Sequence, residues 1–314
     1  MSIVAKIKKN FKLAPLTTFK IGGPARYFIE IKNLTELAEM INWAKAKRQP
    51  IDILAGGSNV LVNDRGVKGL VMKISLSGLK IKAGKIECEA GEKLSKATSL
   101  AAKHGLSGLE WASGIPGTVG GAVHGNAGAF GSQMSQIVFK VIAFDSLKNR
   151  LNSFANNDCR FNYRDSIFKQ SDNLIIVRVI LKFSKGKRTE IDNLAKKYFN
   201  YRLKTQPKYP SAGSIFKNLP LNNLSKRNFK LAEEMKARGL VKGGKVASAW
   251  LIDRLDLKGK AIGGAKISEQ HANFIVNTGK AKSNEIVRLI NFIKRKVKAK
   301  YKIILEEEIK YLGF

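Results

Sequence analysis

Hydrophobic and polar positions in the first 190 residues follow helical and strand periods in turn. From Leu37 to Ala44 the apolar side chains form one helical stripe, and Asn33 with Glu36 three residues later resembles a capping box. This pattern predicts a helix that begins at Asn33 and ends at about Arg48. Other runs predict strands at 51–54, 70–74, 86–90, 137–144 and 174–183 and a helix at 94–103. The alternation indicates a mixed α/β region.

The pattern changes after about residue 190, where helical stripes become more frequent than strands. Helices are predicted at 191–203, 226–238, 247–255 and 283–300, and strands at 274–277 and 303–311. The last strand carries Glu306, Glu307 and Glu308, of which the first and third fall on one face. We therefore expect a smaller α+β domain from about residue 200.

The charge of the chain raises the question of a nucleic-acid partner. Its 314 residues include 57 Lys and Arg against 24 Asp and Glu, a net charge of +33. The lysines are spread along the chain, however, and no aromatic run offers a surface for base stacking. We expect lysine-rich solvated surfaces that attract anionic substrates, and no nucleic-acid partner.

The numbers of cysteines and histidines, together with the lengths of the apolar runs, restrict the metal sites and cellular compartments that are expected. Two cysteines and three histidines exclude a disulfide scaffold and give no zinc-binding spacing. No apolar run reaches the ~18 residues that cross a membrane, and the basic N-terminal segment lacks the apolar core of a secretory signal. We expect a cytoplasmic protein without a metal site or membrane attachment.

The stretch 112–131, ASGIPGTVGGAVHGNAGAFG, consists almost wholly of small residues. Bare backbone N–H groups form concave anion sites, so the stretch predicts a loop that wraps a phosphate-bearing cofactor. A flexible linker is the alternative, although apolar residues such as Val119 and Val123 favour packing. A second cluster, AGGSN at 55–59, lies between two apolar runs. Neither cluster matches the dinucleotide fingerprint or the phosphate loop of nucleotidases.

Three short polar segments contain candidate catalytic residues. Arg164 lies among aromatic and apolar residues, where its guanidinium could clamp a carboxylate or pair structurally with Asp165. Ser214 follows Ala-Gly with Lys217 three residues on, which fits either a reactive hydroxyl beside a cation or a strand with a polar turn. The acids at 306–308 are edge-strand charges or include a buried functional carboxylate.

A series of motifs resembles the UDP-N-acetylenolpyruvoylglucosamine reductase family, in family order and over nearly the whole chain. They are TTFKIGGPAR (17–26), AGGSNVLV (55–62), GIPGTVGGAV (114–123), NAGAFG (126–131), YRDSIF (163–168), QP (206–207), SAGSIFKN (211–218), AWLID (249–253), SEQHANFIVN (268–277) and LEEEI (305–309).

The resemblance implies a fold, cofactors and a substrate. The fold would be α+β, with an FAD-binding region of the vanillyl-alcohol oxidase type at 1–190, made of two α/β subdomains that divide near residue 78. An α+β substrate-binding domain would follow at 200–302, and a terminal strand within 303–314 would return to the FAD-binding region. The protein would be a monomer in which NADPH reduces FAD, and reduced FAD then reduces the enolpyruvyl ether of a UDP-sugar.

The resemblance also assigns roles to particular residues. Ser214 would donate a proton, while Arg164 and Glu308 would hold and polarise the substrate carboxylate. The FAD pyrophosphate would lie against Gly56, Gly57, Ser58, Asn59, Gly114, Gly117, Thr118, Gly120 and Gly121. Expected substrate contacts are Arg202, Lys217, Asn218 and Asn273.

The chain departs from the family pattern in three places, and the first is Gly125, where a larger apolar residue is expected before Asn126. The segment 219–246 looks longer than the usual link and resembles an inserted helix. It could cap the substrate site, but we expect it to decorate the surface. No tyrosine-bearing loop is found between Leu174 and Gln206, which indicates the subgroup that lacks it. Another flavin oxidase or dehydrogenase on the same fold remains an alternative function.

Overall fold

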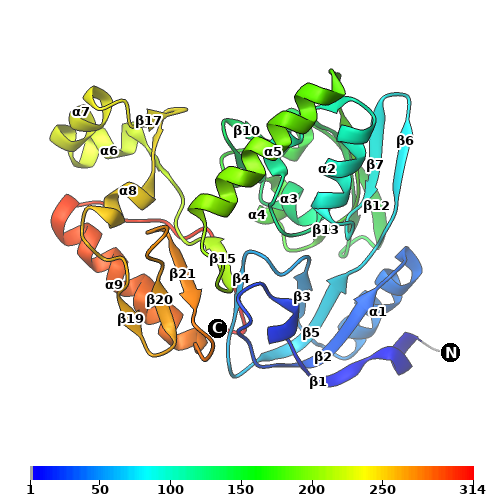
Figure 1. The fold of residues 1–314 in the computed structure, drawn as a ribbon. Helices are drawn as coiled ribbons and strands as arrows, with labels where there is room; N and C mark the ends of the chain where they lie inside the picture. Colours follow the sequence, from blue (N-terminus) through cyan, green and yellow to red (C-terminus); the bar gives the residue numbers. More distant parts are fainter. Residues whose placement is uncertain (1–2) are drawn as a thin grey trace. The chain divides into compact units, whose positions relative to one another are not determined.

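The computed structural model describes residues 3–314, and the chain forms two compact units (Figure 1). The first unit holds the described residues up to Phe11 together with Ala25–Gly57 and Lys68–Lys204. The second holds Lys12–Pro24, Ser58–Val67 and Thr205–Phe314. The second unit thus draws two segments from the N-terminal part of the sequence.

Two sheets build the first unit. The four-stranded sheet has the order β1 (Lys8–Lys12), β2 (Pro24–Ile31), β5 (Val67–Ile74) and β3 (Ile51–Leu54). The five-stranded sheet has the order β12 (Arg150–Ala155), β11 (Val138–Asp145), β13 (Leu174–Lys182), β7 (Lys85–Glu89) and β6 (Leu79–Lys82). The chain passes from the first sheet to the second between Ile74 and Leu79.

Helices and short strands complete the first unit. The helices are α1 (Leu34–Ala46), α2 (Leu94–Lys103), α3 (Val119–His124), α4 (Ile167–Gln170) and α5 (Arg188–Thr205). The short strands are β8 (Leu106–Ser107), β9 (Gly128–Ala129), β10 (Ser132–Gln133) and β14 (Ser184–Lys185).

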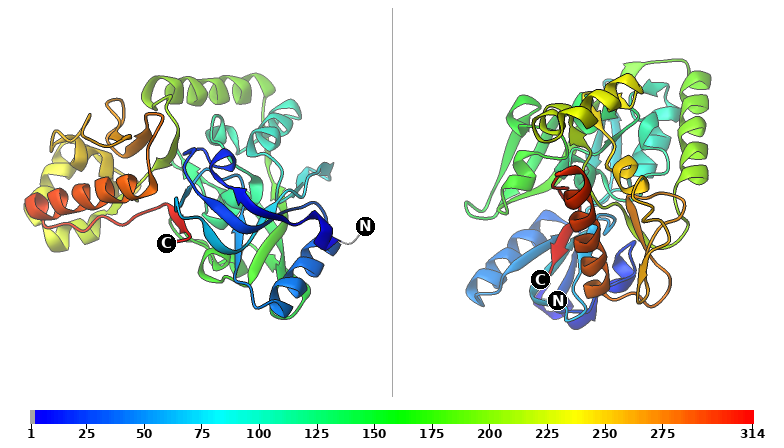
Figure 2. Two further views of the ribbon diagram at one scale, coloured as in Figure 1. Left: turned by 90° about the horizontal axis from the view of Figure 1, so that it is seen from below. Right: turned by 90° about the vertical axis from the view of Figure 1, so that its left-hand side faces the viewer.

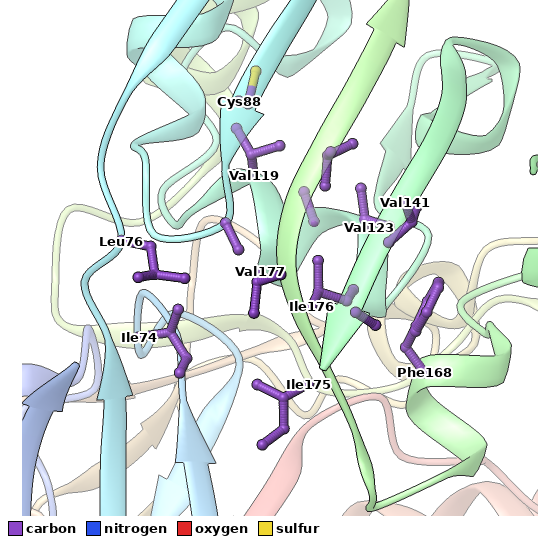
Figure 3. Close-up of a cluster of buried hydrophobic side chains, with 14 of the residues drawn as sticks. Ile74, Leu76, Cys88, Val119, Val123, Val141, Phe168, Ile175, Ile176 and Val177 are labelled. Carbon is purple, nitrogen blue, oxygen red and sulfur yellow. The ribbon is translucent and has the colours of Figure 1, made fainter. Parts of the chain in front are cut away.

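The core of the first unit lies around the central strand β13. Its consecutive residues Ile175, Ile176 and Val177 are all buried, which is the pattern of a strand covered on both faces. Figure 3 shows part of this cluster, in which Val119 and Val123 of α3 lie among side chains of β7, β11 and β13. The glycine-rich stretch is therefore anchored in the core through α3.

The second unit is built around an antiparallel sheet and a long helix. The sheet has the order β15 (Ser211–Ser214), β21 (Phe274–Asn277), β20 (Ala265–Ile267) and β19 (Ala261–Ile262). Helix α9 (Ser283–Tyr301) buries one apolar stripe, which contains Ile286, Leu289, Ile290, Ile293 and Val297. A parallel pair joins β22 (Lys310–Leu312) to β4 (Val60–Val62), a strand from the N-terminal half of the sequence.

A helical segment and a small sheet complete the second unit. The helices are α6 (Leu221–Arg227), α7 (Phe229–Ala237) and α8 (Ser248–Asp253), and the sheet has the order β16 (Leu219–Pro220), β18 (Lys245–Val246) and β17 (Val241–Lys242). The side chain of Asn228 donates to the carbonyl of Tyr301 at 3.2 Å, so this segment lies at the C-terminal end of α9 (Figure 2).

Most predicted elements are confirmed, but several details differ. Asn33 caps α1 by accepting from the backbone N–H of Glu36 at 2.9 Å, but the carboxylate of Glu36 accepts from Lys32 rather than completing a capping box. The helix predicted at 226–238 is interrupted at Asn228. The strand predicted at 303–311 is wrong over most of its length, because only Lys310–Leu312 pairs as a strand and Glu307 forms an isolated bridge.

Among residues 3–314, no helix is both long and apolar enough to cross a membrane. No group of three or more His, Cys, Asp or Glu side chains with metal-binding geometry occurs in the same range.

Candidate active site

The two glycine clusters of the first unit touch one another. A Cβ atom added to Gly56 would lie 2.6 Å from the Cα of Gly117, closer than real side chains approach backbone. A Cβ atom on Gly120 would lie 2.8 Å from the Cβ of Ala90. Gly56 and Gly120 are therefore required by close packing, whereas Gly117, with φ of +124°, is required by its backbone conformation.

The glycine-rich stretch is an ordered part of the fold, so the flexible-linker interpretation is wrong. Thr118 caps α3 by accepting from the N–H of Gly121 at 3.3 Å, and Val119 and Val123 are fully buried. Gly114, Gly117 and Gly121 by contrast keep solvent-accessible backbone that no side chain of their own covers. Such a bare surface fits a bulky group that must approach the backbone closely, as FAD would.

Arg164 contacts the C-terminal half of the same stretch. Its guanidinium donates from Nη2 to the carbonyl of Gly128 at 2.7 Å and from Nη1 to that of Asn126 at 3.5 Å. The neighbouring Asp165 carboxylate accepts from Gln170 Nε2 at 2.7 Å. Sequence reasoning gave Asn126 no role of its own, yet it is fully buried and donates from Nδ2 to the carbonyl of Asn162 at 2.8 Å.

Ser214 ends β15 at a local irregularity. Ser211 pairs with Val276 and Ser214 with Phe274, and the register shifts between the two pairs. Gly213 lies at this shift with φ of +79°, a conformation that side chains disfavour. Bulges of this kind redirect a side chain, so Gly213 sets the direction of the half-buried Ser214.

The segment 306–308 lies directly beside the residues that follow Ser214. Glu308 N–H donates to the carbonyl of Ile215 at 2.8 Å, and Lys217 N–H donates to that of Glu306 at 2.9 Å. The Lys217 ammonium also forms an ion pair with Glu306. The second unit thus brings Ser214, Lys217 and Glu308 onto two adjacent segments.

Two predicted substrate contacts support this arrangement. Asn273 is buried and spans the backbone of Phe216, accepting from its N–H at 2.9 Å and donating to its carbonyl at 2.8 Å. Asn218 accepts from the N–H of Ser248 at 3.3 Å. In the same unit Asn59 donates to the carbonyl of Glu308 at 3.2 Å. Contact of Asn218 and Asn273 with substrate stays a prediction.

Arg202, the remaining predicted substrate contact, lies in the first unit. Its guanidinium donates to the backbone carbonyls of Trp111 and Ser113 at 2.9 Å and 3.0 Å. Burial lowers the pKa of this group. Arg202 therefore contacts the start of the glycine-rich stretch.

Comparison with known proteins agrees with this geometry. Residues 25–145 match the family described as FAD binding domain, and residues 206–312 match the C-terminal domain of UDP-N-acetylenolpyruvoylglucosamine reductase. The expected α+β architecture with an FAD-binding fold is confirmed.

Full-length relatives carry the same name. The reductase of Prochlorococcus marinus is 39% identical over 313 residues, which cover 98% of this chain and 99% of the relative. That of Anoxybacillus flavithermus is 39% identical over 314 residues, covering 99% and 95%. The crystal structure of the reductase from Thermus caldophilus superposes with a TM-score of 0.78 at 31% identity, over 98% of this chain and 99% of that one. The chain belongs to the UDP-N-acetylenolpyruvoylglucosamine reductase family.

Proposed function

We propose that the protein reduces the enolpyruvyl ether of UDP-N-acetylglucosamine to UDP-N-acetylmuramate, a peptidoglycan precursor, with FAD as cofactor and NADPH as reductant. The observation that carries this proposal is the full-length similarity to reductases of that name at 39% identity. The placement of Ser214, Lys217 and Glu308 on adjacent segments supports it.

The residues of the second unit suit protonation of a carbanion. When bound and reduced by NADPH, FAD would supply the hydride for the β-carbon of the enolpyruvyl group. Negative charge then develops on the α-carbon, beside the substrate carboxylate. Ser214 gives its hydroxyl proton to that carbon, which completes the saturated ether. The ammonium of Lys217, which is paired with Glu306, stabilises the serine oxygen as it gives up its proton.

Arg164 and Glu308 are proposed to hold the substrate carboxylate. The planar guanidinium of Arg164 matches a carboxylate in two parallel hydrogen bonds. A protonated Glu308 would add a donor to the same oxygens. Both residues would stabilise the charge that spreads onto the carboxylate as the carbanion forms.

The FAD pyrophosphate is proposed to lie along the bare backbone of the two glycine clusters. In the first unit Gly56, Gly57, Gly114, Gly117, Thr118, Gly120 and Gly121 would contribute. Ser58 and Asn59, which follow Gly57 directly in the chain, would contribute as well. We further propose that the protein acts as a cytoplasmic monomer with a UDP-sugar as its substrate and no nucleic-acid partner.

The Ser214→Ala variant tests the proton donor. Removal of the hydroxyl leaves no acid at the α-carbon, so the oxidative half-reaction with the enolpyruvyl substrate should slow by about 10²-fold or more. Reduction of the flavin by NADPH should stay within about twofold of the wild type. Stopped-flow absorbance at the flavin band measures both steps separately. Unchanged turnover in this variant would remove Ser214 from the mechanism.

A further inference from the structure

Helix α5 contacts both ends of the glycine-rich stretch 112–131. At the start, Arg202 donates from Nε to the carbonyl of Ser113 and from Nη2 to that of Trp111, at 3.0 Å and 2.9 Å. One guanidinium thus holds two carbonyls of the backbone that enters the stretch.

The far end of the stretch is held by stacked rings. The ring of Phe130 stacks on that of Tyr198 with a centroid separation of 4.1 Å and an interplanar angle of 13°. Tyr201 packs edge-on against the Phe130 ring with a centroid separation of 5.4 Å. The Arg202 guanidinium lies 5.1 Å from the centroid of the Phe130 ring. Arg202 therefore contacts the stretch at both of its ends.

The contact between α5 and the stretch is close as well as two-sided. A Cβ atom added to Gly114 would lie 3.1 Å from Phe199 Cδ2 and 3.1 Å from Arg202 Cδ. Phe130 has φ of +54°, a left-handed conformation that non-glycine residues disfavour. Stacking against α5 offsets that cost and selects this conformation.

We propose that α5 is a clamp that holds the glycine-rich stretch in the shape that receives FAD, with Arg202 and Phe130 as positioning residues. The proposal rests on the proposed cofactor site. Ordering a loop costs conformational entropy, so a stretch that is already fixed binds its ligand more tightly. Loss of the clamp should therefore weaken retention of FAD and spare the chemistry that follows.

The test uses the purified holoenzyme and the rate at which it releases FAD, followed as flavin fluorescence recovers on dilution. Arg202→Gln removes the two hydrogen bonds from the guanidinium to the carbonyls of Ser113 and Trp111. Phe130→Ala removes the ring stacking on Tyr198 and leaves those hydrogen bonds in place. Lys197→Gln is the matched control, because it removes a cation from an exposed position of the same helix. Gly121→Val places a side chain in the proposed FAD cradle, the bare backbone of the two glycine clusters.

Arg202→Gln and Phe130→Ala should each speed FAD release by about 10-fold or more, and Arg202→Lys should fall between Arg202→Gln and the wild type. Lys197→Gln should stay within about twofold. The kcat of Phe130→Ala and of Lys197→Gln at saturating FAD should stay within about threefold of the wild type, a split that a general loss of structure would not give. If Arg202→Gln does not fold, Phe130→Ala decides alone, because Phe130 is 40% exposed and its truncation leaves the core intact.

Two outcomes would overturn the clamp and separate it from the cofactor site. Release rates within twofold of wild type in both clamp variants, with faster release from Gly121→Val, would refute the clamp and leave the cradle standing. Unchanged release from all of these variants, Gly121→Val included, would refute the clamp together with the proposed cofactor site.

Discussion

Three consecutive glutamates show how position along an extended segment assigns different roles to one residue type. Glu306 is exposed and pairs with Lys217. Glu307 turns to α9, where Lys294 Nζ donates to it at 2.7 Å, and the Tyr311 hydroxyl donates to it as well. Burial, and then this bond to Glu307, raises the pKa of Tyr311. Glu308 is held through its backbone, because its N–H donates to the carbonyl of Ile215 at 2.8 Å.

Glu36 gives a prediction about pH and stability. Burial opposes ionisation of its carboxyl, but hydrogen bonds from Lys6 Nζ at 2.8 Å and Lys32 N at 2.7 Å outweigh burial and hold its pKa below the usual value. The carboxylate therefore stabilises the fold above the pKa of the unfolded chain, about 4.3, and this stabilisation is lost as pH falls through the lower folded pKa.

At pH 7 the Glu36→Gln variant should lose about 1–2 kcal/mol of unfolding free energy, measured by urea denaturation. The difference from wild type should shrink as the pH falls below about 4.3. Glu39→Gln, at an exposed position of the same helix, is the control and should change little at any pH. A loss at Glu36 that is the same at all pH values would show that packing, not ionisation, is responsible.

At the scale of elements, the segment 219–246 is part of the second core, and the expectation that it decorates the surface is wrong. Its side chains Leu224, Leu231, Ala232 and Met235 are buried together with residues of α8 and α9. The amphipathic period was readable in the sequence. The elements that α7 packs against could not be predicted, because the periodicity of a helix shows which face is buried but not what covers that face.

Met235→Ala should therefore destabilise the protein by about 2–4 kcal/mol, because the fully buried side chain leaves a cavity beside α8 and α9. Urea denaturation monitored by tryptophan fluorescence measures the loss, since Trp250 lies in α8. Lys230→Ala on the exposed face of α7 is the control, with an expected change within about 0.5 kcal/mol. Equal stability of wild type and Met235→Ala would mean that this helix is dispensable to the core.

Elements with a strong local signal were predicted well, and those that depend on distant partners were not. Helix α2 has the predicted bounds, Leu94–Lys103, because its apolar stripe and Gly105 define both ends. Strand β2 was missed, since Pro24–Ile31 opens on a proline and carries charges between its apolar residues. The site residues came from the family motifs; the local pattern alone left Ser214 and Glu308 ambiguous.

At the scale of the whole molecule, the division into units follows contacts that no local pattern encodes. The second unit takes in Lys12–Pro24 and Ser58–Val67 besides its continuous C-terminal part. It does so partly because β22 pairs in parallel with β4, from which it is separated by most of the chain. The AGGSN cluster therefore spans both units, with Gly56 and Gly57 in the first and Ser58 and Asn59 in the second.

The most direct test of the account is an anaerobic absorption experiment on the purified protein. The protein should show a flavin band that bleaches when NADPH is added and returns when the enolpyruvyl ether of UDP-N-acetylglucosamine follows. Recovery with the sugar nucleotide would establish cofactor, donor and acceptor in one series. A colourless protein that takes up no FAD, or a reduced flavin that this substrate leaves bleached, would contradict the proposed function.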